Sequence, residues 1–226
     1  MTDILLVEDN RELSTLIAGF LQKEDYSVTV CDSGEAAVRH MEHDTAKLVL
    51  LDIMLPGMDG FAVCSAIRRD GTIPIVIMSA MSDKQDKLKG YELGADDYIE
   101  KPVDIDLLRM KVRAIMQRSY EMKEPNQIIT CGDVTIDTDA MSVQQAGKKV
   151  DLNVKEYELL LLLVKNAGKT LNKDYLFNEI WGADSFSENQ TLTVHIKRLR
   201  DKIESNPKKP EHIVTVWGVG YKYEEI

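Results

Sequence analysis

The stretch Leu48-Val49-Leu50-Leu51-Asp52-Ile53-Met54-Leu55-Pro56-Gly57-Met58-Asp59-Gly60 decides the fold of the first half of the chain. Four apolar residues run directly into the carboxylate of Asp52, and a turn signal of Pro and Gly follows. Such a run is typical of a strand buried on both faces, as in a parallel sheet. Asp52 then lies at the carboxyl end of a central strand, where open α/β sheets place their sites. A buried carboxylate needs a charged partner, water or a metal ion, although Asp52 could equally be a capping residue before the next helix.

Apolar runs and amphipathic helices alternate through residues 1–119, which we assign to the first domain. The predicted strands are Ile4–Val7, Ser27–Cys31, Leu48–Asp52, Ile73–Met78 and Asp97–Ile99. The predicted helices are Arg11–Lys23, Gly34–His43, Phe61–Arg69, Lys84–Leu93 and Ile105–Arg118. Five strands alternating with five helices predict an α/β flavodoxin-like fold, a (βα)5 doubly wound parallel sheet with helices on both faces.

Charged and polar side chains follow four of these strands. Glu8 and Asp9 follow the first strand, Asp52 ends the third, Ser79 follows the fourth and Lys101 follows the fifth. In a flavodoxin-like strand order these ends meet at one edge of the sheet. Each residue alone has an ordinary explanation, but three clustered carboxylates repel one another unless a cation lies among them. Hard oxygen ligands beside a phosphate site favour Mg²⁺.

Such a centre suits phosphoryl transfer. Asp52 can stay ionised and attack an activated phosphoryl group, which forms an acyl phosphate. Mg²⁺ and the Lys101 ammonium would neutralise the phosphoryl oxygens, with the Ser79 hydroxyl as a further donor. The rival activity is phosphate-ester hydrolysis. Its usual second acid, two residues after the nucleophile, would fall at Met54, so we expect the protein not to be an enzyme.

The motifs of the first half resemble the receiver domain of two-component response regulators. They are Glu8-Asp9, Asp52 with Pro56 and Gly60, Ser79-Ala80, Gly94-Ala95-Asp96-Asp97-Tyr98 and Lys101-Pro102. The resemblance implies that a sensor histidine kinase phosphorylates Asp52, docking on the helix face around Arg11, Ser14, Thr15 and Ala18. It implies that Asp9, Asp52 and the Met54 carbonyl bind Mg²⁺, with Glu8 acting through water. It also implies that Ser79 and Tyr98 move on phosphorylation and that the Lys101-Pro102 bond is cis.

Receivers of the OmpR/PhoB type form homodimers on phosphorylation, through the fourth helix, fifth strand and fifth helix. The candidate residues for ion pairs between subunits are Lys87, Glu92, Asp96, Asp97, Lys111 and Arg113. Leu107 stands where this group usually carries a Glu that pairs with the position of Lys87, and Val103 replaces a common Phe. Exposed ion pairs contribute only about 0–1 kcal/mol each. Dimerisation is therefore expected to survive, with an apolar contact in place of that pair.

Charge differs between the two halves of the chain. The net charge of −10 divides into −8 for residues 1–121 and −2 for residues 122–226, while residues 195–210 carry +4. This distribution predicts two different tasks. Three widely spaced cysteines, no signal peptide pattern and no long apolar run predict a cytoplasmic protein with reduced thiols that does not enter the membrane. A polar segment at residues 120–127 is the predicted linker.

The second domain, residues 128–226, begins with a period-two pattern up to Leu152, which predicts a small antiparallel sheet. Helices are predicted at Val154–Asn166, Lys173–Ile180 and Asn189–Glu204, the first with a capping box of Asn153 and Glu156. A loop at 183–187 precedes the third helix. A glycine-bearing hairpin at Ile213–Tyr223 ends the chain. The pattern predicts an α+β winged helix-turn-helix domain.

The third helix has an apolar stripe and an opposite basic face, which favours a recognition helix in the major groove. Its sequence from Asn189 to Ile203, with the run Val216–Tyr221, resembles the winged-helix output domain of the OmpR/PhoB group. The resemblance implies double-stranded promoter DNA contacts from Gln190, Thr193, His195, Lys197, Arg198, Arg200, Trp217 and Lys222. Trp217 stands where many members have Arg, and an aromatic residue there could pack on a sugar or anchor the wing.

Together these features predict a DNA-binding response regulator. A phosphorylated receiver dimer would place two winged helices on tandem promoter repeats, and RNA polymerase would be a further partner. The coupling would be a population shift, so that the unphosphorylated protein binds DNA more weakly. A DNA-binding protein whose receiver is vestigial is the remaining alternative, and the intact set of pocket residues argues against it.

Overall fold

A computed structural model of the chain describes residues 2–80, 84–117, 127–182 and 189–226. The chain divides into two compact units, Met1–Glu121 and Met122–Ile226. The predicted linker, apart from Gln127, and the predicted loop at 183–187 lie outside the described residues. Among the described helices, none combines the length and the hydropathy that a bilayer span requires. All three cysteines are buried, and none of the three forms a disulfide.

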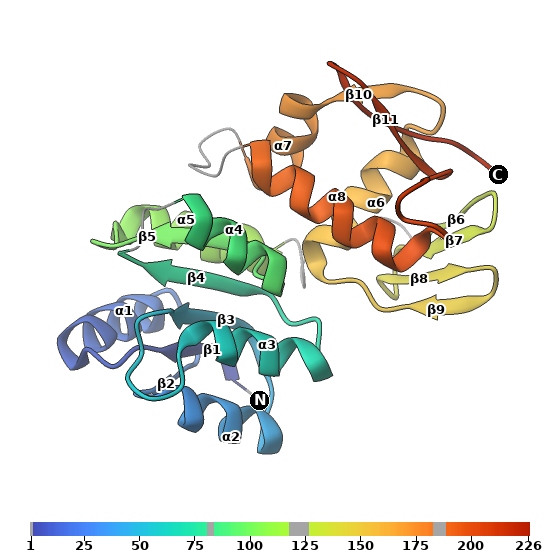
Figure 1. Cartoon of the computed structure of the whole chain (residues 1–226). Coiled ribbons are helices and arrows are strands. Elements are labelled where there is room, and N and C mark those ends of the chain that lie inside the picture. Colours follow the sequence, from blue (N-terminus) through green and yellow to red (C-terminus); the bar gives the residue numbers. More distant parts are fainter. Residues whose placement is uncertain (1, 81–83, 118–126, 183–188) are drawn as a thin grey trace. The chain divides into compact units, whose positions relative to one another are not determined.

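The first unit contains a parallel sheet in the order β2-β1-β3-β4-β5, with helices on both faces (Figure 1). The strands are β1 (Thr2–Val7), β2 (Val28–Cys31), β3 (Ala46–Asp52), β4 (Ile75–Ser79) and β5 (Asp97–Glu100). The helices are α1 (Arg11–Lys23), α2 (Gly34–His43), α3 (Gly60–Asp70), α4 (Lys84–Leu93) and α5 (Ile105–Met116). The predicted flavodoxin-like fold is confirmed.

Strand β3 lies at the centre of the sheet and contributes to the core on both faces. Leu48 and Leu50 pack with residues of α1 and α5, and Val49 and Leu51 pack with residues of α2 and α3. All four side chains are completely buried. Alternate residues of a strand point to opposite faces, so burial on both faces fixes the register of β3. Asp52 is thereby held at the carboxyl end of the sheet.

The second unit combines two small antiparallel sheets with three helices (Figure 1). The first sheet is β6 (Ile128–Cys131), β7 (Val134–Asp137), β8 (Ser142–Gln145) and β9 (Lys148–Val150). The helices are α6 (Val154–Lys165), α7 (Lys173–Trp181) and α8 (Asn189–Ile203). The second sheet is β10 (Thr170–Asn172), β11 (Ile213–Val216) and β12 (Gly220–Tyr223), in the order β10-β12-β11. The unit is a winged helix, as predicted.

The C-terminal hairpin is more extensive than predicted, because β10 adds a third strand beside β12. Leu171 pairs with Tyr221, and Asn172 pairs with Gly220. A Cβ on Gly220 would lie 1.9 Å from the Leu171 carbonyl oxygen, so the glycine permits this close approach. The hairpin of β11 and β12, which we call the wing, is therefore part of a three-stranded sheet in which β12 is the middle strand.

A buried carboxylate joins the end of α8 to the start of β11. Glu204 accepts hydrogen bonds from the backbone N–H groups of Glu211 (2.9 Å), His212 (3.2 Å) and Ile213 (2.8 Å). The His212 ring lies between two carboxylates, with Nδ1 3.2 Å from Glu204 and Nε2 2.8 Å from Asp133. Burial alone would raise the pKa of Glu204, but the hydrogen bonds from these N–H groups outweigh it and lower the pKa.

Replacing Glu204 with Ala is expected to destabilise the second unit by about 1–3 kcal/mol, because three buried or half-buried N–H groups lose their acceptor. Since folding lowers the pKa of Glu204, its contribution is present above the ordinary glutamate pKa and is lost as the pH falls through the folded-state value. Denaturant unfolding at neutral and acidic pH measures both effects. Glu211→Ala, at an exposed neighbour, should unfold like the wild type at neutral pH. Equal stability of the two variants there would contradict the role of Glu204.

Candidate functional site

The carboxylate of Asp52 lies at the carboxyl edge of the first sheet and is 2% exposed. Its Oδ1 accepts a hydrogen bond of 2.9 Å from the Met54 backbone N–H, and its Oδ2 lies 2.6 Å from the Lys101 ammonium. The same ammonium lies 2.8 Å from Oε2 of Glu8, which is 1% exposed. Lys101 therefore bridges two buried carboxylates that come from the ends of β1 and β3.

A third carboxylate completes an acidic cluster. Glu8, Asp9 and Asp52 each offer one oxygen, and these oxygens lie within 4.8 Å of one another. Opposed ligands of an octahedral Mg²⁺ lie about 4.2 Å apart, since each bond is about 2.1 Å. Three carboxylates and one ammonium also leave two formal negative charges, which a divalent cation would neutralise. The donor set and its spacing therefore fit Mg²⁺ after a small inward movement, or with water between the ion and one carboxylate.

Glu8 and Lys101 both have raised pKa values in this pocket. Burial raises the pKa of Glu8; the hydrogen bond from Lys101 opposes that rise and the nearby Asp52 charge adds to it. Burial would lower the pKa of Lys101, but its hydrogen bonds to Asp52 and Glu8 outweigh burial and raise the pKa. Lys101 therefore stays a cation at neutral pH.

The segment that follows β3 is held against Asp52 by close backbone packing. The Gly60 N–H donates to the Ile53 carbonyl at 3.1 Å. A Cβ on Gly60 would lie 2.2 Å from the Asp52 backbone oxygen and 2.7 Å from the Ile53 Cα. Because these obstacles are backbone atoms, only glycine allows α3 to begin here.

The remaining pocket residues lie on β4 and β5. Ser79 ends β4 and is completely buried, and its carbonyl accepts a hydrogen bond of 2.8 Å from the Lys101 N–H. Tyr98 is buried, with the Lys87 ammonium 5.5 Å from its ring centroid. The Lys101-Pro102 bond is cis, as the resemblance implied. The strand ends thus bring together Glu8, Asp9, Asp52 and Lys101, while Ser79 lies at the end of the neighbouring strand β4.

Helix α8 presents only some of the predicted DNA contacts at its surface. Thr193 and Lys197 are exposed, and Trp217 in the wing is 90% exposed. Lys222 forms an ion pair with Glu224 and stays half-buried. The side chain of Gln190 lies outside the described residues. The exposed members are therefore the better candidates for a contact with DNA.

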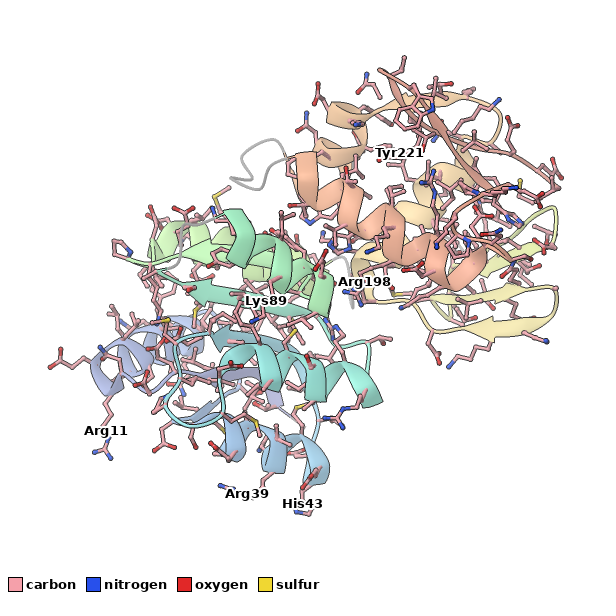
Figure 2. The ribbon with its side chains drawn as sticks, in the orientation of Figure 1. Arg11, Arg39, His43, Lys89, Arg198 and Tyr221 are labelled. Atoms are coloured by element: carbon pink, nitrogen blue, oxygen red, sulfur yellow. The ribbon has the colours of Figure 1, made fainter. Side chains whose placement is uncertain are left out.

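Three other predicted contacts have structural roles. His195 is completely buried, with its ring centroid 5.1 Å from that of Trp181, so its assignment to DNA bases is corrected: it belongs to the core. Arg198, labelled in Figure 2, lies 3.2 Å from the buried Glu156 carboxylate. Arg200 donates from Nε to the Ile213 carbonyl at 3.0 Å and from its terminal nitrogen to Thr215 Oγ1 at 2.8 Å. Arg200 thus holds the wing against α8.

Comparison with known proteins assigns a different protein family to each of the two units. The response regulator receiver domain family matches residues 4–113, and the transcriptional regulatory protein C-terminal family matches residues 147–223. The solved structure of the response regulator DrrB, a Thermotoga maritima OmpR/PhoB homologue, covers 99% of both chains with 32% identity and a TM-score of 0.52. The sensory transduction protein RegX3 of Mycolicibacterium smegmatis is 39% identical over 99% of this chain and 100% of its own length.

This chain belongs to the OmpR/PhoB response regulators. A mutant of RitR has a similar structure, with 29% identity over all of both chains and a TM-score of 0.77. As a two-component response regulator, the protein joins a receiver to a DNA-binding domain, an organisation consistent with transcriptional regulation. The family is one of transcriptional regulators and not of classical enzymes.

In this response regulator, several residues predicted to pair between subunits are paired within the chain. Asp96 is 1% exposed and lies 2.6 Å from Arg68, and Asp97 lies 2.7 Å from Lys111. Lys87 pairs with Glu100. Glu92 and Arg113 are exposed, and Leu107 is half-buried. Burial removes Asp96 from the candidates for a subunit contact.

Only part of the predicted kinase-docking face of α1 lies at the surface. On the predicted kinase-docking face of α1, Arg11 and Thr15 are exposed, and Figure 2 shows Arg11 pointing away from the sheet, but Ser14 and Ala18 are buried. Glu35 has a role near the site that the sequence patterns did not reveal: its Oε1 accepts a hydrogen bond of 3.0 Å from Met58 N–H. Glu35 thereby steadies the loop after Asp52. Only its place in the first turn of a helix beside the sheet edge could have suggested this role.

Replacing Gly60 with Ala is expected to destabilise the receiver by about 1–3 kcal/mol, because the new methyl group would overlap backbone atoms. Thermal unfolding of the full chain measures the loss. Gly19→Ala is the matched control, since a Cβ at that helical position meets nothing within 4 Å. The control should be neutral or stabilised by up to about 1 kcal/mol. Equal melting of Gly60→Ala and Gly19→Ala would contradict the close-packing account.

Proposed function

We propose that this protein accepts a phosphoryl group on Asp52 from a sensor histidine kinase, dimerises through its receiver and then binds tandem promoter DNA repeats. The observation that carries the proposal is the Asp52 carboxylate, with one oxygen held by the Met54 N–H, the other held by Lys101, and two more carboxylates within metal-binding distance. Regulation of transcription implies contact with RNA polymerase, which stays a prediction.

This geometry supports the transfer of a phosphoryl group to Asp52. An Asp52 oxygen attacks the phosphorus of a phosphohistidine, the P–N bond breaks, and the imidazole leaves with its electron pair and takes up a proton. An acyl phosphate remains on Asp52. Asp9, Asp52 and the Met54 carbonyl would hold Mg²⁺, with Glu8 acting through water, and the bound ion would neutralise charge on the phosphoryl oxygens. Lys101, 2.6 Å from Asp52, would contact the new dianion, and the Ser79 hydroxyl would donate to it.

The receiver face of α4, β5 and α5 is the proposed dimer surface. Glu92 and Arg113 are exposed there, and Lys87 and Leu107 are partly so. Met110 on α5 is 55% exposed and adds apolar area close to Leu107 in the sequence. Asp97 and Lys111 would have to leave their internal pair to bind a second subunit. An apolar contact around Leu107 and Met110 therefore replaces part of the expected charge pairing.

Asp52→Asn is expected to abolish phosphorylation, because an amide cannot form the acyl phosphate. Incubation with radiolabelled acetyl phosphate and Mg²⁺, followed by hydroxylamine treatment, measures the label and its acyl character. Sedimentation of the same samples measures dimer formation. Asp59→Asn is the matched control, since Asp59 lies in the same loop and only caps α3 through the Ala62 N–H. Stable label on Asp52→Asn would contradict the assignment of the acceptor.

Lys197→Ala is expected to weaken DNA binding and to reduce the slope of log affinity against log salt concentration by about one unit, as for one lost phosphate contact. Binding is measured on a duplex enriched from random DNA by the phosphorylated protein. Lys148→Ala, at an exposed lysine of β9 in the other sheet, should leave both quantities unchanged. An unaltered salt slope for Lys197→Ala would remove Lys197 from the DNA contacts.

A further inference from the structure

The side chain of Trp217 is the most exposed large apolar group among those of the described residues. It is 90% exposed, whereas Trp181, the other of the two tryptophans, is 7% exposed and stacks on Phe177 at 5.3 Å between ring centroids. Val219, two residues further on, is 49% exposed. Trp217 therefore does not anchor the wing by packing beneath it. An exposed apolar tip of this kind is typical of a contact surface.

The turn that carries Trp217 is tight. Val216 pairs with Gly220, which leaves residues 217–219 as a three-residue loop, closed by a 3.0 Å hydrogen bond from Val219 N–H to the Val216 carbonyl. Gly218 is the third residue of the turn 216–219 and has a φ of +75°, a left-handed conformation that favours glycine. The loop holds no Lys or Arg. The wing tip is thus a short apolar point rather than a cationic one.

Strand β11, which leads into this loop, is held against α8, the helix proposed to contact DNA bases. Arg200 of α8 bonds to the Ile213 carbonyl and to Thr215 Oγ1, and its guanidinium lies 5.6 Å from the Tyr221 ring centroid. The Lys173 N–H at the start of α7 donates to the Val219 carbonyl at 3.3 Å. Trp217 lies two residues beyond Thr215, or roughly 7 Å along the strand. Its position relative to α8 is therefore set before any partner binds.

We propose that Trp217 is an apolar wedge that enters the minor groove of DNA beside the major groove occupied by α8. This inference rests on the proposed DNA-binding function and assigns a chemistry to its wing. The minor groove is about 6 Å wide, which admits an indole ring edge-on. Proteins that insert apolar side chains there unstack base steps and bend the duplex. The binding energy of such a wedge depends on how easily the DNA deforms and not on its charge. We therefore expect it to favour flexible pyrimidine–purine steps where it enters the groove.

This role differs from a phosphate contact in its salt dependence. A lost phosphate contact lowers both the affinity and the salt slope, whereas a lost apolar wedge lowers the affinity alone. Stacking of one aromatic ring typically corresponds to a change in affinity of about tenfold or more on truncation. Trp217→Ala and Lys197→Ala should therefore weaken binding in two distinguishable ways.

The direct test is acrylamide quenching of tryptophan fluorescence in the full-length phosphorylated protein, with and without the enriched duplex. Because Trp181 is buried, quenching in the free protein should come mainly from Trp217. Addition of duplex should protect Trp217 from acrylamide. If Trp217 is instead protected from acrylamide without DNA, increasingly at higher protein concentration, the wing tip contacts a second copy of the protein. That result would overturn the proposal.

The matching binding measurement uses Trp217→Ala, with Ile128→Ala as the control for loss of an exposed apolar side chain. Trp217→Ala should lose about tenfold in affinity with an unchanged salt slope, and Ile128→Ala, in the other sheet, should bind like the wild type. Normal binding by Trp217→Ala, with Trp217 still quenched in the complex, would overturn the wedge but leave the proposed function intact. Failure of the wild-type protein to bind any duplex would overturn both.

Discussion

The ammonium group of Lys101 holds together carboxylates from two strands that are far apart in the sequence. It lies 2.6 Å from Asp52 and 2.8 Å from Glu8, both almost completely buried. Buried charges are tolerated only when they are paired. The contact therefore requires a particular arrangement of strands and helices in the first unit. The ends of β1, β3 and β5 must meet at one edge, β3 must be covered on both faces, and α3 must begin close enough to Asp52 to require Gly60.

The same lysine links the pocket to the surface proposed for pairing. Its backbone N–H bonds to the Ser79 carbonyl, and Glu100, the residue before it, pairs with Lys87 on α4. In the proposed function, a phosphoryl group on Asp52 becomes a competing acceptor for the ammonium. A shift of Lys101 toward that group would therefore act on β4, β5 and α4 together. This short series of contacts gives a physical path for a population shift between two receiver states.

Local patterns in the sequence predict much of this architecture. The apolar run before Asp52 predicted the central strand. The capping box of Asn153 and Glu156 predicted the start of α6, and both of its hydrogen bonds are present. Strand β10 escaped prediction because three residues carry no periodicity, and Thr170–Asn172 is a strand only through its pairing with β12.

The wrong assignment of His195 on α8 has a different cause. His195 lies three residues after Leu192, so helical spacing alone could have placed it on the buried stripe. Its basic neighbours favoured DNA instead. Arg200 lies at the edge of that stripe, and only the folded position of β11 reveals its partners. Sequence patterns thus locate strand ends and helix faces, but the partner of a long side chain depends on tertiary packing.

A crystal structure of the full-length protein grown with Mg²⁺ and beryllofluoride would show whether Asp52, beside Lys101, is the phosphoryl acceptor. We expect a metal ion about 2.1 Å from oxygens of Asp9, Asp52 and the Met54 carbonyl, beryllofluoride on Asp52, and the Lys101 ammonium in contact with the beryllofluoride. A metal ion bound elsewhere, or an Asp52 that stays unmodified with Lys101 turned away from it, would contradict the account.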